Sequence, residues 1–160
     1  MDRPARPIMR PSSDGGAGFG PEVDVADGAI LHDTALIHGR VRLAAGVSVW
    51  PNVVIRAEAH HVEIGENTNL QDFVMVHVGY DTPTVVGRNC SITHHVTIHG
   101  CQIGDDCLIG INATVMDGAV IGAGSIVAGH AIVTEGAVFP PHSIIAGTPA
   151  KLVKSRDCSA

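Results

Sequence analysis

A period of six residues runs through most of this chain and restricts its fold more than any other feature. From residue 103 to 150 every sixth position carries a large aliphatic or aromatic residue, followed four positions later by a small residue or, finally, a proline. The large residues are Ile103, Ile109, Val115, Ile121, Val127, Val133, Phe139 and Ile145. A fixed short period indicates that each unit is a strand and a turn, stacked on its neighbours.

The same period returns upstream from Val25, with two interruptions. These are RAEAHHVE (56–63) and VGYDTPTV (78–85). If three units make one triangular coil, residues 18 apart lie one above another at about 4.8 Å, the spacing of strands in a sheet. A sandwich of short antiparallel strands is the alternative, but it does not explain the strict phase. Segments that leave a rigid scaffold are frequent places for function.

Composition narrows the class of protein. The 160 residues suggest one domain, and with aromatic residues at 3% the core must consist of small and branched aliphatic side chains. The net charge of −6, without a run of Lys or Arg, argues against nucleic acid and anionic membranes as partners. No segment has the apolar length of a membrane span or a secretory signal, so we expect a cytoplasmic protein.

The first 24 residues lie outside the repeat, whereas two of the cysteines lie within it. Residues 1–24 are rich in Pro, Gly and Ser and predict a flexible arm, with an ordered strap along an oligomer as the alternative. Cys90 and Cys107 fall on inward-facing repeat positions, which favours buried small hydrophobic residues over catalytic thiols.

Two histidines occupy equivalent positions in different units. His77 and His99 each directly follow the large aliphatic residue of their unit, and they are 22 residues apart. Without the four extra residues of the second interruption the separation is 18, one full coil. We therefore expect both side chains to stack on one outer face, where neutral imidazoles would suit a shared metal ion.

A third histidine lies on a different edge of the triangle. His94 holds the third place of its unit, so it should not reach an ion bound by His77 and His99 of its own chain. A closed ring of three chains would bring it to the neighbour's pair. Three imidazoles leave tetrahedral zinc one position for water. From spacing alone, histidines on a solvated face are the alternative. The adjacent His95 should point the other way and be structural.

Four stretches resemble the γ-class carbonic anhydrase family of the hexapeptide-repeat superfamily. They are VWPNVVIRAE (49–58), IGENTNLQDFVMVH (64–77), HHVTIHGCQIG (94–104) and IAGTPAKLV (145–153). The family pattern falls on Arg56, Gln71, Asp72, His77, His94 and His99. The resemblance implies an all-β fold, a left-handed parallel β-helix over residues 25–150. Residues 151–160 would form a short tail with little or no C-terminal helix.

The resemblance also implies a site and a reaction. The expected protein is a homotrimer that binds zinc, or iron or cobalt, through His77, His94 and His99 at sites shared between subunits. Arg56 and Asp72 would pair across the subunit interface, and Gln71 would orient the metal-bound water. The expected activity is that of a carbonic anhydrase-like lyase, in which metal-bound hydroxide attacks the small substrate carbon dioxide to give bicarbonate.

The chain also departs from the family pattern. Glu58 stands where the family has an Asp, and the family's acidic loop is replaced by a short segment that contains Tyr80 and Asp81. We predict Glu58 to be catalytic, with His60 and His61 as further candidates for proton transfer. Tyr80 and Asp81 are expected to form a substrate loop.

Three other functions are compatible with the sequence. The same site would also serve a metal-dependent hydrolase, such as an acyl-coenzyme A thioesterase, or a biosynthetic enzyme. The repeat itself is shared with acyltransferases that need no cluster of three histidines. Finally, a trimeric scaffold would keep the fold without catalysis.

Overall fold

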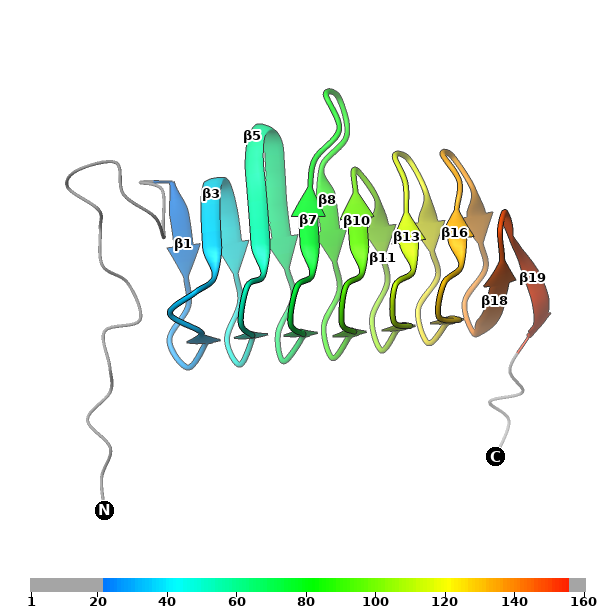
Figure 1. The fold of residues 1–160 in the computed structure, drawn as a ribbon, viewed down its shortest axis with the longest axis horizontal. Helices are drawn as coiled ribbons and strands as arrows, with labels where there is room; N and C mark the ends of the chain where they lie inside the picture. Colours follow the sequence, from blue (N-terminus) through cyan, green and yellow to red (C-terminus); the bar gives the residue numbers. More distant parts are fainter. Residues whose placement is uncertain (1–21, 156–160) are drawn as a thin grey trace, which may run out of the picture.

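A computed structural model describes residues 22–155, and its backbone winds through short strands joined by tight turns (Figure 1). The strands are β1 Val23–Val25, β2 Ile30–Leu31, β3 Leu36–Leu43, β4 Ser48–Val49, β5 Val54–Ile64, β6 Asn69–Leu70, β7 Met75–His77, β8 Thr84–Val86, β9 Ser91–Ile92, β10 Thr97–His99, β11 Gln102–Ile103, β12 Leu108–Ile109, β13 Thr114–Val115, β14 Val120–Ile121, β15 Ile126–Val127, β16 Ile132–Val133, β17 Val138–Phe139, β18 Ser143–Gly147 and β19 Ala150–Ser155. Residues 1–21 of the expected arm and residues 156–160 of the expected tail lie outside the described residues.

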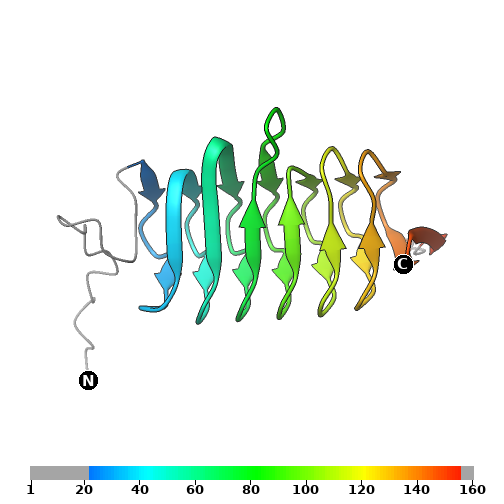
Figure 2. The same cartoon turned by 45° about the horizontal axis from the view of Figure 1, so that its top comes forward.

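The coils stack in register, as the period predicts. Where the repeat is uninterrupted, a residue pairs with the residue 18 positions later, as Ile103 does with Ile121 and Ile121 with Phe139. About seven turns build a left-handed β-helix, and Figure 2 shows its coils side by side along one axis. The predicted fold class is therefore confirmed, and between residues 22 and 155 no helix is long and apolar enough to cross a membrane.

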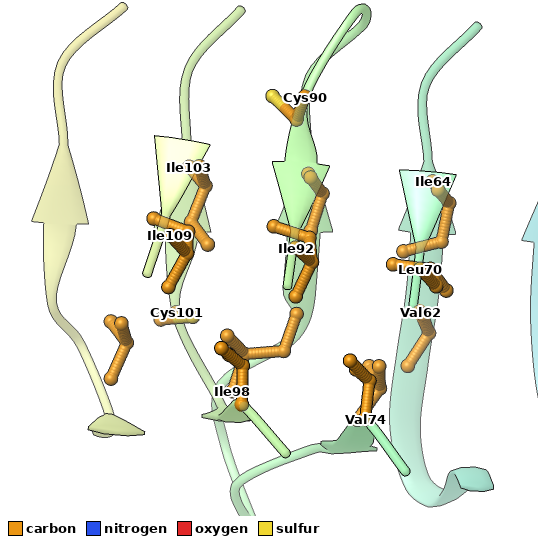
Figure 3. Packing of buried hydrophobic residues seen from close by; sticks show 14 of the residues in the cluster. Val62, Ile64, Leu70, Val74, Cys90, Ile92, Ile98, Cys101, Ile103 and Ile109 are labelled. Carbon is orange, nitrogen blue, oxygen red and sulfur yellow. The ribbon is translucent and has the colours of Figure 1, made fainter. Parts of the chain in front are cut away.

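The core is a set of columns of aliphatic side chains that run along the axis. Ile64, Leu70, Ile92, Ile98 and Ile109 are at most 2% exposed and point into the coil (Figure 3). Small residues recur once in each six-residue unit, near every corner of the coil. Among them are the predicted Cys90 and Cys107, which are 1% and 2% exposed.

The first interruption of the repeat is not the loop that the sequence suggested. Residues 56–63 belong to the long strand β5, which pairs with β3 on both sides of an irregularity. Gly39 pairs with Ala57 and Arg40 with His61, so three residues, 58–60, bulge from the ladder. The expectation was wrong because a bulge adds residues to a strand without ending it. In the sequence such a bulge cannot be told from a loop, since both interrupt the six-residue period.

Two other segments complete the described chain. The second interruption connects β7 to β8 and rises above the neighbouring turns in both views (Figures 1 and 2). At the other end, β19 pairs antiparallel with β18, so residues 150–155 close the last coil as a strand. Part of the segment expected to be a tail is therefore paired with the solenoid.

The core columns lead to a prediction for two adjacent residues of β12. Ile109→Ala should lower the free energy of unfolding by about 2–5 kcal/mol, because it leaves a cavity between coils. The matched control Leu108→Ala should change it by less than about 0.5 kcal/mol, since that side chain is 41% exposed. Urea unfolding of both variants at one protein concentration measures the difference. Equal losses would contradict this account of the core.

A second prediction concerns the buried thiol of Cys101. Burial raises its pKa from 9.0 to about 12. The folded state therefore retains a proton that the unfolded chain releases above pH 9, and the resulting stabilisation is lost as the pH rises toward 12. In this window we expect stability to fall with pH less steeply in Cys101→Ala than in the wild type, by at most about 1.4 kcal/mol per pH unit. Parallel slopes in pH-dependent urea unfolding would refute the prediction.

Candidate metal centre

His77 and His99 lie side by side on one outer face of the solenoid. They are register partners on β7 and β10, as the sequence predicts. Nδ1 of His77 is 2.8 Å from Nε2 of His99, and the two rings meet edge to face with centroids 4.7 Å apart. The fixed spacing of adjacent strands therefore brings two imidazole nitrogens together without any contribution from a flexible loop.

A carboxylate lies at the far nitrogen of each ring. Nε2 of His77 is 3.0 Å from Oε1 of Glu58, and Nδ1 of His99 is 2.8 Å from Oδ2 of Asp117. The four groups form one continuous chain of polar contacts. Asp117 was not identified from the sequence, because the strands β10 and β13 pair with an offset of 17 residues and Asp117 lies one position beyond the counterpart of His99.

Glu58 lies on the bulge of β5, and its carboxylate contacts two cationic or potentially cationic groups. It pairs with Arg56 as well as with His77. Its own backbone N–H and then the His77 imidazole hold the pKa of the Glu58 carboxyl below the ordinary value of 4.5. The group is therefore ionised at neutral pH and can accept a hydrogen bond from Nε2 of His77.

His94 lies on the turn between β9 and β10 and has no described contact with His77 or His99. Its Nδ1 is 3.2 Å from Oδ2 of Asp72, and its side chain is 47% exposed. His95 stacks instead on Phe73, with ring centroids 4.8 Å apart, so the two neighbouring histidines make separate contacts as expected. Within residues 22–155 no three His, Cys, Asp or Glu side chains are placed to hold a metal ion together.

The His77–His99 pair has the chemistry that a zinc, iron or cobalt ion requires, since neutral imidazole is a ligand for each of them. A tetrahedral zinc ion with Zn–N bonds of about 2.0–2.1 Å holds its ligand nitrogens about 3.3 Å apart. The two rings would have to separate by about half an ångström from their present contact. Two donors are too few for a stable site, so an ion bound here would need a further ligand beyond those that the described residues of one chain bring together.

The other residues predicted for the site lie at different distances from it. Arg56 is the register partner of both His38 and His77, so it belongs to the same column of the outer face. Gln71 is half-buried on the turn after β6, and Tyr80 and Asp81 are exposed beyond β7. Tyr80, at 88% exposure, is directed into solvent rather than onto the histidines.

His60 and His61 form a separate pair on the β5 bulge. Their Nδ1 atoms are 3.0 Å apart, and the backbone N–H of His61 donates to Nδ1 of His60. Both therefore have local partners close to Glu58 in sequence, and neither has a described contact to His77 or His99. Their predicted part in proton transfer remains a prediction.

Comparisons with known proteins agree with the repeat. The family model described as bacterial transferase hexapeptide (six repeats) matches residues 100–135. The mitochondrial gamma carbonic anhydrase 2 of Arabidopsis thaliana is 36% identical over 91 residues, which are 53% of this chain and 33% of that protein. The carnitine operon protein CaiE of Escherichia coli is 39% identical over 127 residues, 79% of this chain and 65% of that protein.

A solved structure is similar over most of the chain. A hexapeptide transferase family protein from Anaplasma phagocytophilum is 31% identical, covers 88% of this chain and 84% of its own, and superimposes with a TM-score of 0.82. The two curated relatives are longer, and this chain spans less than two thirds of the length of each.

Proposed function

We propose that this chain, which belongs to the γ-class carbonic anhydrase-like family of hexapeptide-repeat proteins, is a homotrimeric metalloenzyme that hydrates carbon dioxide to bicarbonate. The observation that carries the proposal is the approach of Nδ1 of His77 to within 2.8 Å of Nε2 of His99. A divalent ion bound by imidazoles supplies water that ionises near neutral pH. Zinc is the expected ion, with iron or cobalt as alternatives.

The third ligand is proposed to be His94 of a neighbouring subunit. Within a chain His94 contacts Asp72 through Nδ1, which leaves Nε2 available to a group outside the chain. Its half-exposed position on a corner suits a contact between subunits. Three chains arranged in a closed ring would repeat that contact three times, so every site would draw on two subunits.

The remaining residues would bind water, handle protons and close the interface. Gln71, on the turn that leads to Asp72, would hydrogen-bond the reacting water. Glu58 Oε1, ionised at neutral pH and next to Nε2 of His77, would accept a proton released in hydration. Arg56 would pair across the interface with Asp72 of the next subunit. Tyr80 and Asp81 remain the predicted substrate loop.

Metal binding and hydration should depend together on one histidine of the pair. Full-length wild type loaded with zinc or ferrous ion is expected to accelerate carbon dioxide hydration in a stopped-flow assay, and to contain one ion per chain by elemental analysis. His99→Ala should lose both properties, because one imidazole cannot hold the ion. His32→Ala, which changes an exposed histidine on the turn after β2, should keep both. Equal metal content and rates in wild type and His99→Ala would rule out the proposed site.

Mixing two inactive variants tests whether the site is shared. His94→Ala chains keep the pair and His99→Ala chains keep His94, so each homotrimer lacks complete sites. If the chains exchange at random in an equal mixture, about a quarter of the sites should regain all three ligands. Metal content and hydration rate after dissociation and reassembly measure this recovery. A mixture that stays as inactive as its components would exclude ligands from different subunits.

Acyl transfer is a second candidate, favoured by the transferase family name of the solved relative from Anaplasma phagocytophilum. This reaction would use a histidine as general base and would not need the ion. Consumption of acetyl-coenzyme A by chelator-treated protein, with a panel of amine and hydroxyl acceptors, distinguishes the two functions. Transfer that is insensitive to chelation would favour this candidate over hydration.

A further inference from the structure

The carboxylate of Asp117 contacts two parts of the chain that are far apart in sequence. Its Oδ2 is 2.8 Å from Nδ1 of His99, and its Oδ1 accepts a hydrogen bond of 3.1 Å from the hydroxyl of Thr82. Thr82 lies in the connection between β7 and β8, whereas Asp117 lies on the turn after β13. One carboxylate thus joins a proposed metal ligand to the raised loop.

Two glycines leave the space that this carboxylate occupies. A Cβ atom on Gly79 would lie 2.1 Å from Oδ1 of Asp117, and one on Gly100 would lie 2.3 Å from the same atom. Any other residue at either position would displace the carboxylate or the loop. The position of the Asp117 side chain therefore requires glycine at residues 79 and 100.

The base of the loop is also fixed to the strands that carry the histidines. The hydroxyl of Thr84 donates to the carbonyl oxygen of His77 and accepts a 2.8 Å hydrogen bond from the N–H of Gly100. Within the loop, the N–H of Gly79 donates to the carbonyl oxygen of Thr82 over 2.9 Å. Thr84 and Asp117 thus hold the loop at two points, one beside each histidine.

The carboxylate at His99 is part of a pattern shared by all three proposed ligands. Each ring has one nitrogen within 3.2 Å of a carboxylate oxygen, from Glu58, Asp72 or Asp117. A carboxylate at one nitrogen of an imidazole selects the tautomer with the proton on that nitrogen, and leaves the lone pair of the other for a metal ion. For His99 the freed lone pair is that of Nε2, which in the metal-free chain can accept a hydrogen bond from Nδ1 of His77 over 2.8 Å; an ion would take the place of that shared proton.

We propose that Asp117 is a positioning residue that fixes the Nδ1–H tautomer and the ring orientation of His99, and that it anchors the β7–β8 loop through Thr82. As far as the metal is concerned, this inference rests on the proposed function. The part that concerns the tautomer of His99 does not rest on the proposed function, because the contact between Asp117 and His99 exists within a single chain.

The test compares two Asp117 variants and two control variants of the full-length protein with wild type. Zinc affinity is measured by competition with a chromophoric chelator, and the His99 tautomer by long-range proton–nitrogen NMR of the metal-free protein at a pH where the ring is neutral. Asp117→Ala should weaken zinc binding about 10- to 100-fold and abolish the preference for Nδ1–H. Asp117→Asn, which retains an acceptor oxygen, should restore the tautomer and part of the affinity.

Two control variants distinguish the positioning of His99 by Asp117 from effects of losing the loop contact or any surface carboxylate. Thr82→Val removes only the contact with the loop, so it should leave the His99 tautomer as in wild type while loop amides exchange faster with solvent. Asp105→Ala removes a different carboxylate, paired with Arg88, and should leave both readouts unchanged. Thermal unfolding of each variant reports whether it folds. Asp117→Asn serves as the test variant if Asp117→Ala does not fold, and it should then bind zinc more weakly than wild type.

The outcomes distinguish this inference from the proposed function. Wild-type zinc affinity and an unchanged His99 tautomer in Asp117→Ala, or wild-type zinc affinity in Asp117→Asn if only that variant folds, would overturn the positioning role while leaving the metal site intact. If wild type itself binds no zinc, the proposed function fails. The tautomer comparison in metal-free protein then decides the role of Asp117: a loss of Nδ1–H in Asp117→Ala supports it, and no change overturns it.

Discussion

In-register stacking of parallel coils is the constraint on which the rest of this structure depends. Each coil lies one strand spacing from the next, so a side chain recurs directly over its counterpart. Inside the solenoid the result is continuous columns such as Ile103, Ile121 and Phe139. On the outside the same stacking aligns His77 with His99, and the turn that follows β13 in the next coil brings Asp117 to His99. The core and the candidate site are therefore products of one repeat.

The sequence was sufficient wherever the six-residue period was intact or its extra residues could be counted and subtracted. It predicted the inward columns, the burial of Cys90 and the alignment of His77 with His99, because these follow from counting positions. It could not predict that residues 56–63 continue a strand, since pairing around a bulge depends on β3. The direction of Tyr80 was equally beyond reach, because a loop without a repeat has no register.

Each proposed ligand is held in place within its own chain but remains an incomplete site there. Carboxylates of Glu58, Asp72 and Asp117 contact His77, His94 and His99, whereas the described residues of one chain bring no third ligand to the pair. Rigid coils would thus hold the two halves of the proposed site at separate places on the solenoid. Only a second copy of the chain would join them, which couples the proposed chemistry to assembly.

The most direct test is a crystal structure of the zinc-loaded protein with anomalous diffraction recorded on both sides of the zinc absorption edge. Our account predicts one anomalous peak at each subunit interface, within bonding distance of His77 and His99 of one chain and His94 of the next. A peak bound by residues of a single chain would contradict it. So would trimers whose interfaces contain the three histidines but no zinc.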